Sequence, residues 1–248
     1  MIILKSQDEI KRIGEACLIV AETLEGIKRI VVPGITTAEL DRFAESFIVS
    51  KNAAPAFKGY RGYPASLCAS INEEVVHGIP SSTKLKEGDI ISLDVGVYYK
   101  GFFGDAALTL PVGKAGEEAK KLLSVTEEAL YRGIENAVIG KRLFDISFAI
   151  QSHVEDAGFS VVRNFVGHGI GRELHEEPQL PNYGRPGEGS ALMEGMTLAI
   201  EPMVNTGGWE VAILNNSWTA VTKDKSLSAH FEHTVAIMSE GPKTLTKL

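Results

Sequence analysis

Four acidic residues stand in or beside short apolar runs, where a carboxylate is costly to bury without a partner or a metal ion. Asp94 and Glu201 close two similar stretches that lie 107 residues apart, each a Glu-Gly turn followed by an apolar run. Asp105 and Glu232 lie in two further strand-like runs. The repetition indicates a duplicated fold in which each half directs acids at one shared centre.

Asp94 and Asp105 are expected to approach each other across a β-hairpin. Its turn lies at Tyr99-Lys100-Gly101, where Gly101 can supply a positive φ. Directly opposite residues in such a hairpin have Cβ atoms about 4.5–5.5 Å apart. Two carboxylates this close repel unless they share a proton or a cation. The alternative is that one of them points to solvent at the hairpin edge.

The remaining polar candidates each have an ordinary alternative. Glu201 and Glu232 could be exposed strand acids on an alternating face. His168 stands between two glycines, which argues against a regular helix and lets the backbone approach a ligand closely. A loop histidine is nevertheless more often plain polar surface, and the same holds for His77 and His175.

Together, four carboxylates and one imidazole would form an oxygen-rich site with a single nitrogen ligand. That composition suits hard or borderline divalent ions, whereas structural zinc prefers cysteine and histidine. Two such ions about 3.5–4 Å apart can share a water and make it nucleophilic near neutral pH. The residues therefore predict a two-metal hydrolase with nearby histidines as polar helpers, and they do not identify its substrate.

The elements that must position these residues also repeat. Amphipathic helices are predicted over residues 6–27 and after a Thr36–Glu39 capping box, then over residues 117–134 and after Gly140. Strand-like runs follow each helix pair, and a segment rich in glycine and aromatic residues spans Phe57–Tyr63. This order predicts an α+β fold, a single catalytic domain over residues 1–248 with pseudo-repeats of about 1–113 and 114–248, rather than a parallel βαβ sheet.

Composition excludes several classes of function. The chain has 248 residues, 25 basic and 32 acidic, and a net charge of −7, which disfavours a nucleic-acid binder. No apolar stretch is as long as a membrane span, and the start of the chain lacks a signal-peptide pattern. Cys17 and Cys68 are the only cysteines, so a reducing, cytoplasmic location is expected, with no membrane partner.

An ordered set of motifs resembles the type I methionine aminopeptidases of the short bacterial kind, which form subfamily A of the M24 peptidases. The resemblance covers essentially the whole chain and rests on Asp94 with Asp105 eleven residues later and on residues 72–80, 167–171, 175–178, 200–202 and 228–234. It implies the pita-bread fold, two pseudo-symmetric halves around a curved antiparallel sheet. It also implies removal of the N-terminal methionine from nascent proteins and peptides when the second residue is small, by attack of metal-activated water on the first peptide bond.

The same resemblance implies roles for individual residues. The metal ligands would be Asp94, Asp105, His168, Glu201 and Glu232, with Asp105 and Glu232 bridging two ions of Co, Mn, Fe or Zn. Glu201 would also be the general base and proton shuttle, and Asp94 would help to hold the substrate amine. His175 would stabilise charge on the substrate oxygen, and His77 would bind near the scissile amide.

Other expectations also follow from position in the family pattern. The methionine pocket would be lined by Tyr60, Tyr63, Cys68, Leu174 and Trp218, with ordinary core packing as the alternative for each. A monovalent cation is expected near Asn72, Glu74 and Ser228. Nascent N-termini, met at the ribosome, are the expected partners of a monomeric enzyme. Four residues depart from the family pattern and put the second metal site and the pocket in question: Gly96, Phe103, Leu174 and His230.

Two rival functions remain open from the sequence. An Xaa-Pro dipeptidase or aminopeptidase P shares the fold and ligands but normally carries a further N-terminal domain. A metal-free pita-bread binding protein belongs to a different class, and such relatives have usually lost several ligands. All five ligands are present here, which favours an enzyme.

Overall fold

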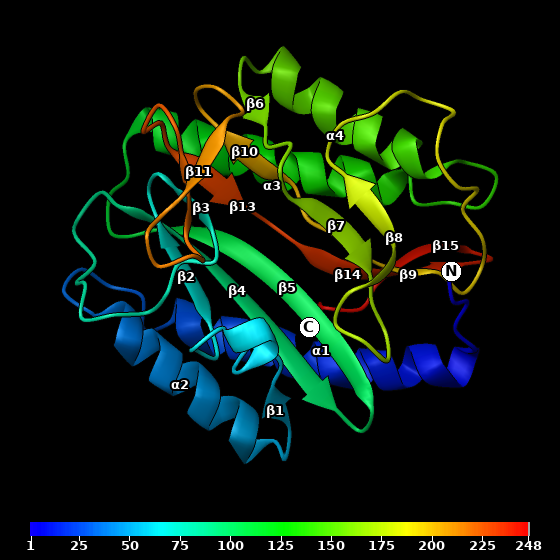
Figure 1. Ribbon diagram of the computed structural model, residues 1–248, viewed down its shortest axis with the longest axis horizontal. Helices are drawn as coiled ribbons and strands as arrows, with labels where there is room; N and C mark the ends of the chain where they lie inside the picture. The colour runs from blue at the N-terminus through cyan, green and yellow to red at the C-terminus, as the bar shows by residue number, and fades with distance from the viewer. Residues whose placement is uncertain (248) are drawn as a thin grey trace.

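Two helix pairs lie on opposite sides of the molecule, with antiparallel strands between them (Figure 1). The structure is a computed structural model that describes residues 1–247. Its helices are α1 (Gln7–Lys28), α2 (Thr37–Ser50), α3 (Glu117–Glu135) and α4 (Leu143–Asp156), with a 3-10 turn, η1, at Tyr60–Gly62. Among these residues, no helix is long and apolar enough to cross a lipid bilayer.

Within residues 1–247 the strands form four small sheets in which every pairing is antiparallel. The sheet nearest α1 has the order β1-β4-β2 with β5 also on β4, and the five-stranded sheet has the order β15-β14-β9-β7-β8. The strands are β1 (Ala54–Pro55), β2 (Cys68–Ile71), β3 (Glu74–Val76), β4 (Ile90–Tyr99), β5 (Phe102–Pro111), β6 (Ser160–Val161), β7 (Val166–Gly169), β8 (Glu176–Pro181), β9 (Thr197–Ile200), β10 (Met203–Asn205), β11 (Val211–Ile213), β12 (Ala220–Thr222), β13 (Ser228–His230), β14 (His233–Met238) and β15 (Gly241–Thr244).

The duplication predicted from sequence is visible in local geometry. Both Glu-Gly turns place their glycine at positive φ, +91° at Gly88 and +87° at Gly195. The glycines that precede α2 and α4, Gly34 and Gly140, match in the same way at +95° and +93°. Isolated bridges join each helix start to its Glu-Gly turn region: Thr36 to Lys84 and Arg142 to Ala191. The halves therefore repeat their framework, and the boundary near residue 113 stays a prediction.

Capping boxes start the first two helices; the one at Thr36–Glu39 was predicted, whereas at Ser6 only the helix start was. The Ser6 hydroxyl accepts from the backbone N–H of Glu9, and the Glu9 carboxylate accepts from the backbone N–H of Ser6. Thr36 and Glu39 make the same reciprocal pair at α2. These contacts satisfy backbone donors that a helix N-terminus otherwise leaves free.

The β4–β5 hairpin corrects one expectation. Asp94 pairs with Ala107 and Asp105 with Gly96, so the two acids are diagonal neighbours on one face rather than directly opposite. The tight turn at Lys100-Gly101 has φ values of 48° and 88°, which sets this register. The acids still point to the same side of the sheet because their register differs by two residues.

A seam of hydrogen bonds joins the two halves along β5. Ala107 and Glu232 exchange both backbone hydrogen bonds, at 3.4 and 2.8 Å. On either side a threonine hydroxyl completes the pattern, with Thr109 donating to the carbonyl of His230 and Thr234 donating to the carbonyl of Asp105, both at 2.8 Å. The seam therefore fixes Asp105 from the first half against Glu232 from the second.

The close approach of α1 to β5 generates a stability prediction. A Cβ on Gly104 would lie 2.7 Å from the backbone nitrogen of Cys17, so Gly104→Ala should lower the free energy of unfolding by about 1–3 kcal/mol. The matched control is Gly14→Ala, where a Cβ meets nothing within 4 Å and removal of a helix glycine should stabilise by up to about 1 kcal/mol. Urea unfolding measures both, and equal effects would contradict the packing argument.

Candidate metal centre and peptide cavity

One cavity of about 150 Å³ collects every residue that the sequence nominated for the divalent ions, catalysis or the methionine pocket. Phe57 and Arg61 also line it. The nominated residues in its lining are Tyr60, Tyr63, Cys68, His77, Asp94, Asp105, His168, Leu174, His175, Glu201, Trp218 and Glu232. Phe57 and Arg61 were missed, although both lie in the aromatic segment from Phe57 to Tyr63 that the sequence marked as unusual.

The four acids enter this cavity from four different segments. Asp94 lies on β4, Asp105 on β5, Glu201 directly after β9, and Glu232 between β13 and β14. Asp105 and Glu232 are 4% and 2% exposed, so the alternative of an exposed strand acid is wrong for Glu232. The strand-like run expected around Glu232 is broken at this residue, because its backbone pairs with β5 in the seam.

Burial raises the pKa values of all four carboxyl groups, and neighbouring acids raise those of three of them further. Desolvation raises the pKa of Asp94 to about 7. The pKa values of Asp105, Glu201 and Glu232 also lie well above the ordinary range, first because of desolvation and then because of the neighbouring acids. A protonated cluster is one solution to this repulsion, and a divalent cation among the carboxylates is the other.

Unpaired oxygen atoms favour the cation. Among the described residues, Asp94 Oδ1, Asp105 Oδ1 and Glu232 Oε1 are buried without a hydrogen-bond partner. Buried polar atoms normally have one, so these oxygens need a ligand. Asp105, His168 and Glu232 can each offer a ligand atom within 4.8 Å of the other two, which is a geometry suited to holding a metal ion. The donor set of carboxylates with one imidazole fits borderline divalent ions.

His168 is prepared as a nitrogen ligand. It lies in strand β7, not in a loop as expected, and Gly167 is needed there because a Cβ would lie 2.5 Å from the carbonyl oxygen of Ala199. Its Nδ1 lies 2.9 Å from the carbonyl oxygen of Gly169, so Nδ1 carries the proton and Nε2 presents its lone pair. Burial lowers the pKa of His168 to about 4, which keeps the ring neutral.

The carboxylate of Glu201 lies between two imidazoles. His168 Nε2 is 3.5 Å from Oε1 and His230 Nε2 is 3.7 Å from Oε2. His230 is buried, and its Nε2 has no hydrogen-bond partner among the described residues. His230, one of the four departures from the family pattern, is therefore a close neighbour of Glu201. Its sequence motif did not reveal this position.

His77 and His175 both line the cavity. His77 has a strained positive φ of 60°, and its ring packs edge-on against Phe165 and Trp218. His175 stacks on Tyr60, contacts its hydroxyl through Nδ1 at 2.8 Å, and lies 4.3 Å from the His168 ring. Desolvation lowers both pKa values, that of His77 to about 4, so both rings are neutral near pH 7.

The apolar wall of the cavity is a small cluster separate from the two helix-packed cores. Tyr63 lies edge-on to Trp218 at 5.1 Å, and Leu174 and Cys68 are both buried beside them. Phe103, another departure from the family pattern, packs against the same cluster. The residues thus belong to a packed cluster and line a cavity at once, so their two expected roles are compatible.

Hydrogen bonds connect the residues expected to form the monovalent cation site. The N–H of Ser228 donates to the carbonyl of Asn72, and the N–H of Ile71 donates to the carboxylate of Glu74. These contacts bring the three nominated residues into one region, and cation binding there stays a prediction.

Comparisons with known proteins agree with this geometry. Residues 11–239 match the profile described as metallopeptidase family M24, so the chain is a member of that class of metal-dependent peptidases. A methionine aminopeptidase from Clostridium perfringens is 57% identical over 99% of both chains. A crystal structure of methionine aminopeptidase from Thermotoga maritima superposes with a TM-score of 0.99 at 48% identity, covering 100% of both. The chain therefore belongs to the methionine aminopeptidases of family M24.

The pita-bread fold is likewise confirmed. The prolidase of Pyrococcus horikoshii shares it with a TM-score of 0.81 at 25% identity, and the match covers 99% of this chain but 63% of the prolidase. The mixed α and β architecture with antiparallel sheets is the one expected from the sequence.

The raised carboxyl pKa values predict how metal binding depends on pH. Because these pKa values are higher in the folded protein than in an unfolded chain, the metal-free protein loses stability as pH rises from about 4 through about 7. A divalent ion stabilises the ionised forms, so Mn²⁺ should raise the melting temperature more at pH 7.5 than at pH 5. Thermal melts with EDTA or Mn²⁺ test this, and an equal rise at both values would contradict it.

Proposed function

We propose that this protein removes the N-terminal methionine from polypeptides whose second residue is small, using a pair of divalent ions. The observation that carries the proposal is the convergence of four carboxylates with unpaired oxygens and one neutral imidazole on a cavity with an aromatic wall. The proposed ligands are Asp94, Asp105, His168, Glu201 and Glu232. Membership of the methionine aminopeptidases supports the choice of substrate.

The ions, when bound, would polarise the first peptide carbonyl and make water nucleophilic near neutral pH. Glu201 is the proposed general base, because its side chain is 13% exposed, whereas Asp105 and Glu232, which line the same cavity, are more deeply buried. The two imidazoles beside it limit how far the carboxylate can turn. Asp94 is proposed to hold an ion and to help bind the substrate amine.

Two neutral histidines are proposed to handle the peptide bond. His175 has its Nδ1 engaged by the Tyr60 hydroxyl, which leaves Nε2 to interact with the carbonyl oxygen as negative charge develops there. His77 is proposed to bind the substrate near the scissile amide. The methionine side chain would lie against Tyr63, Cys68 and Trp218, since aromatic rings and a thiol suit a polarisable thioether.

Finer features of the proposal rest on the family resemblance. The native ion is drawn from Co, Mn, Fe and Zn, because the ligand set accepts each. We also propose a cytoplasmic monomer that acts on nascent chains at the ribosome, with a monovalent cation near Asn72, Glu74 and Ser228. Size-exclusion chromatography tests the monomeric state, and co-sedimentation with ribosomes tests the site of action.

The nearest alternative substrate is an Xaa-Pro peptide. It is disfavoured because similarity to the Pyrococcus horikoshii prolidase stops at 25% identity, against 57% for a methionine aminopeptidase. After chelation and reconstitution with Mn²⁺ or Co²⁺, the protein should cleave Met-Ala-Ser and leave Xaa-Pro peptides intact. Cleavage of only the Xaa-Pro peptides would overturn the proposed function. A protein that binds no divalent ion by calorimetry would instead favour a metal-free binding role.

Substitution of the proposed general base tests the chemistry separately. Glu201→Gln should lower kcat on Met-Ala-Ser by roughly 10²–10⁴-fold, since a positioned acid–base group contributes about that much. The matched control is Glu117→Gln on the exposed first turn of α3, which should leave kcat unchanged. Steady-state kinetics on metal-reconstituted protein measures both, and a Glu201→Gln variant with normal kcat would exclude the assigned role.

A further inference from the structure

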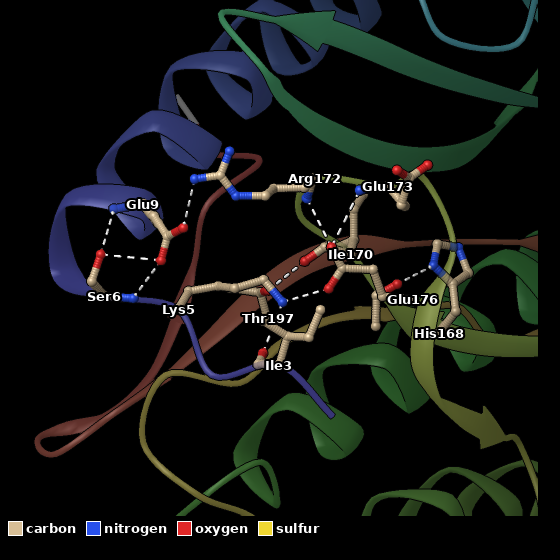
Figure 2. A network of polar contacts seen from close by, with 11 residues as sticks. Ile3, Lys5, Ser6, Glu9, His168, Ile170, Arg172, Glu173, Glu176 and Thr197 are labelled. Atoms are coloured by element: carbon tan, nitrogen blue, oxygen red, sulfur yellow. Dashed lines mark hydrogen bonds and ion pairs between the residues drawn. The ribbon is translucent and has the colours of Figure 1, made fainter. Parts of the chain in front are cut away.

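A buried ion pair links the start of the chain to Glu176, the residue that follows the cavity loop, which we define as residues 171–175 (Figure 2). The Lys5 ammonium contacts Glu176 Oε2, and the two side chains are only 3% and 5% exposed. The residues are 171 positions apart in sequence. Removing two charges from water is costly, and a pair of this kind contributes little net stability compared with apolar residues of similar volume. Its position therefore suggests a role other than stability.

The second oxygen of Glu176 organises the turn that precedes it. Glu176 Oε1 accepts from the backbone N–H groups of Arg172 at 2.8 Å and Glu173 at 3.2 Å. Figure 2 shows these bonds beside the Lys5 contact on the same carboxylate. Lys5 thus holds one oxygen of a carboxylate whose other oxygen holds the backbone of residues 172–173.

That turn delivers two cavity residues. Leu174 and His175 directly follow the bonded amides, and both line the cavity. The first residue of the turn, Gly171, is tightly held. A Cβ on it would lie 2.8 Å from Glu176 Oε1, and its carbonyl accepts a hydrogen bond from the N–H of Phe103. A shift of the Glu176 carboxylate would therefore move the backbone that carries Leu174 and His175.

Lys5 is also bonded to the turn that precedes β9 and Glu201. Its backbone N–H donates to the carbonyl of Gly195 at 2.7 Å, and its ammonium also donates to the carbonyl of Ile3 at 2.8 Å. Gly195 is the turn glycine of the second Glu-Gly motif, six residues before Glu201. Lys5 therefore spans two segments, one that ends at Glu201 and one that ends at His175.

We propose that Lys5 is a positioning residue of the active site, which acts through Glu176 to set Leu174 and His175 relative to Glu201. The inference rests on the proposed function, because it assumes that His175 contacts the reacting carbonyl. A structural role alone would predict loss of stability without a change in the residues that line the cavity. Positioning instead predicts that the cavity loop loosens in a protein that is fully folded.

The test uses variants of the full chain reconstituted with Mn²⁺ for kinetics, and without added metal for NMR. Lys5→Met leaves Glu176 as a buried unpaired charge, so the double variant Lys5→Met/Glu176→Gln removes that charge while its amide oxygen can still accept from the turn. Lys5→Arg is the conservative variant. Arg172→Gln is the control, because Arg172 lies on the same turn and its substitution breaks only an exposed ion pair with Glu9 of α1.

In the double variant we expect kcat on Met-Ala-Ser to fall by about 10–100-fold with a smaller change in KM, because a small misplacement of a catalytic group lowers the rate by this order. The NMR signals of the His175 ring should shift, and the amides of residues 172 and 173 should exchange with solvent faster. Lys5→Arg should keep most of the wild-type kcat, because it keeps a cation beside Glu176. Arg172→Gln should have the kcat, His175 signals and amide exchange of the wild type.

A folded double variant with wild-type kcat, His175 signals and amide exchange would overturn the proposal. Failure of the proposed function gives a different result, because the wild type itself would then not cleave Met-Ala-Ser. The His175 signals and amide exchange still decide the positioning role in that case, since neither depends on turnover.

Discussion

The constraint on which this structure depends is the confinement of four carboxylates in one cavity. Each loses water, which raises its pKa, and the acidic neighbours of Asp105, Glu201 and Glu232 raise theirs further, so without a compensating cation the site opposes its own ionisation. A fixed backbone framework is needed to keep such groups close together. The β5 seam supplies it, since the paired backbones of Ala107 and Glu232 and the two threonine hydroxyls beside them leave Asp105 and Glu232 little freedom to separate.

Duplication explains the framework but not the chemistry. Asp94 and Glu201 follow matching Glu-Gly turns, yet their surroundings differ. Asp94 sits mid-strand in β4, opposite Cys68 of β2 and on the same face as Asp105, so its neighbours are an acid and a thiol. Glu201 follows the end of β9 and has an imidazole nitrogen near each oxygen. Equivalent positions thus acquire different neighbours, which is consistent with the separate roles proposed for them in metal binding and proton transfer.

Local signals in the sequence predicted local structure well. The Thr36 capping box, the glycine turns and the helix pairs follow from contacts between residues a few positions apart, so one sequence suffices to find them. The hairpin register and the seam could not be found in this way, because they depend on which residues face each other across segments far apart in the sequence. For the same reason the sequence predicts a loop at His168, although its flanking glycines allow a strand that neighbouring backbone approaches closely. Likewise, Arg61 and Phe57 were missed because only the fold brings their segment over the acids.

The departure at Gly96 illustrates how the site compensates for a lost side chain. Gly96 lies two residues after Asp94 on the same face of β4, and a Cβ there would lie 2.5 Å from the ring of Phe57. The ring of Phe57 thus occupies the volume that a larger residue at 96 would need, and it lines the cavity together with Asp94. An apolar ring offers no hydrogen bond to a carboxylate, and Asp94 Oδ1 has no partner among the described residues. Glycine at 96 thus leaves an apolar ring, rather than a polar side chain, in this part of the cavity wall. The proposed metal ligand Asp94 accordingly keeps one oxygen that no protein donor occupies.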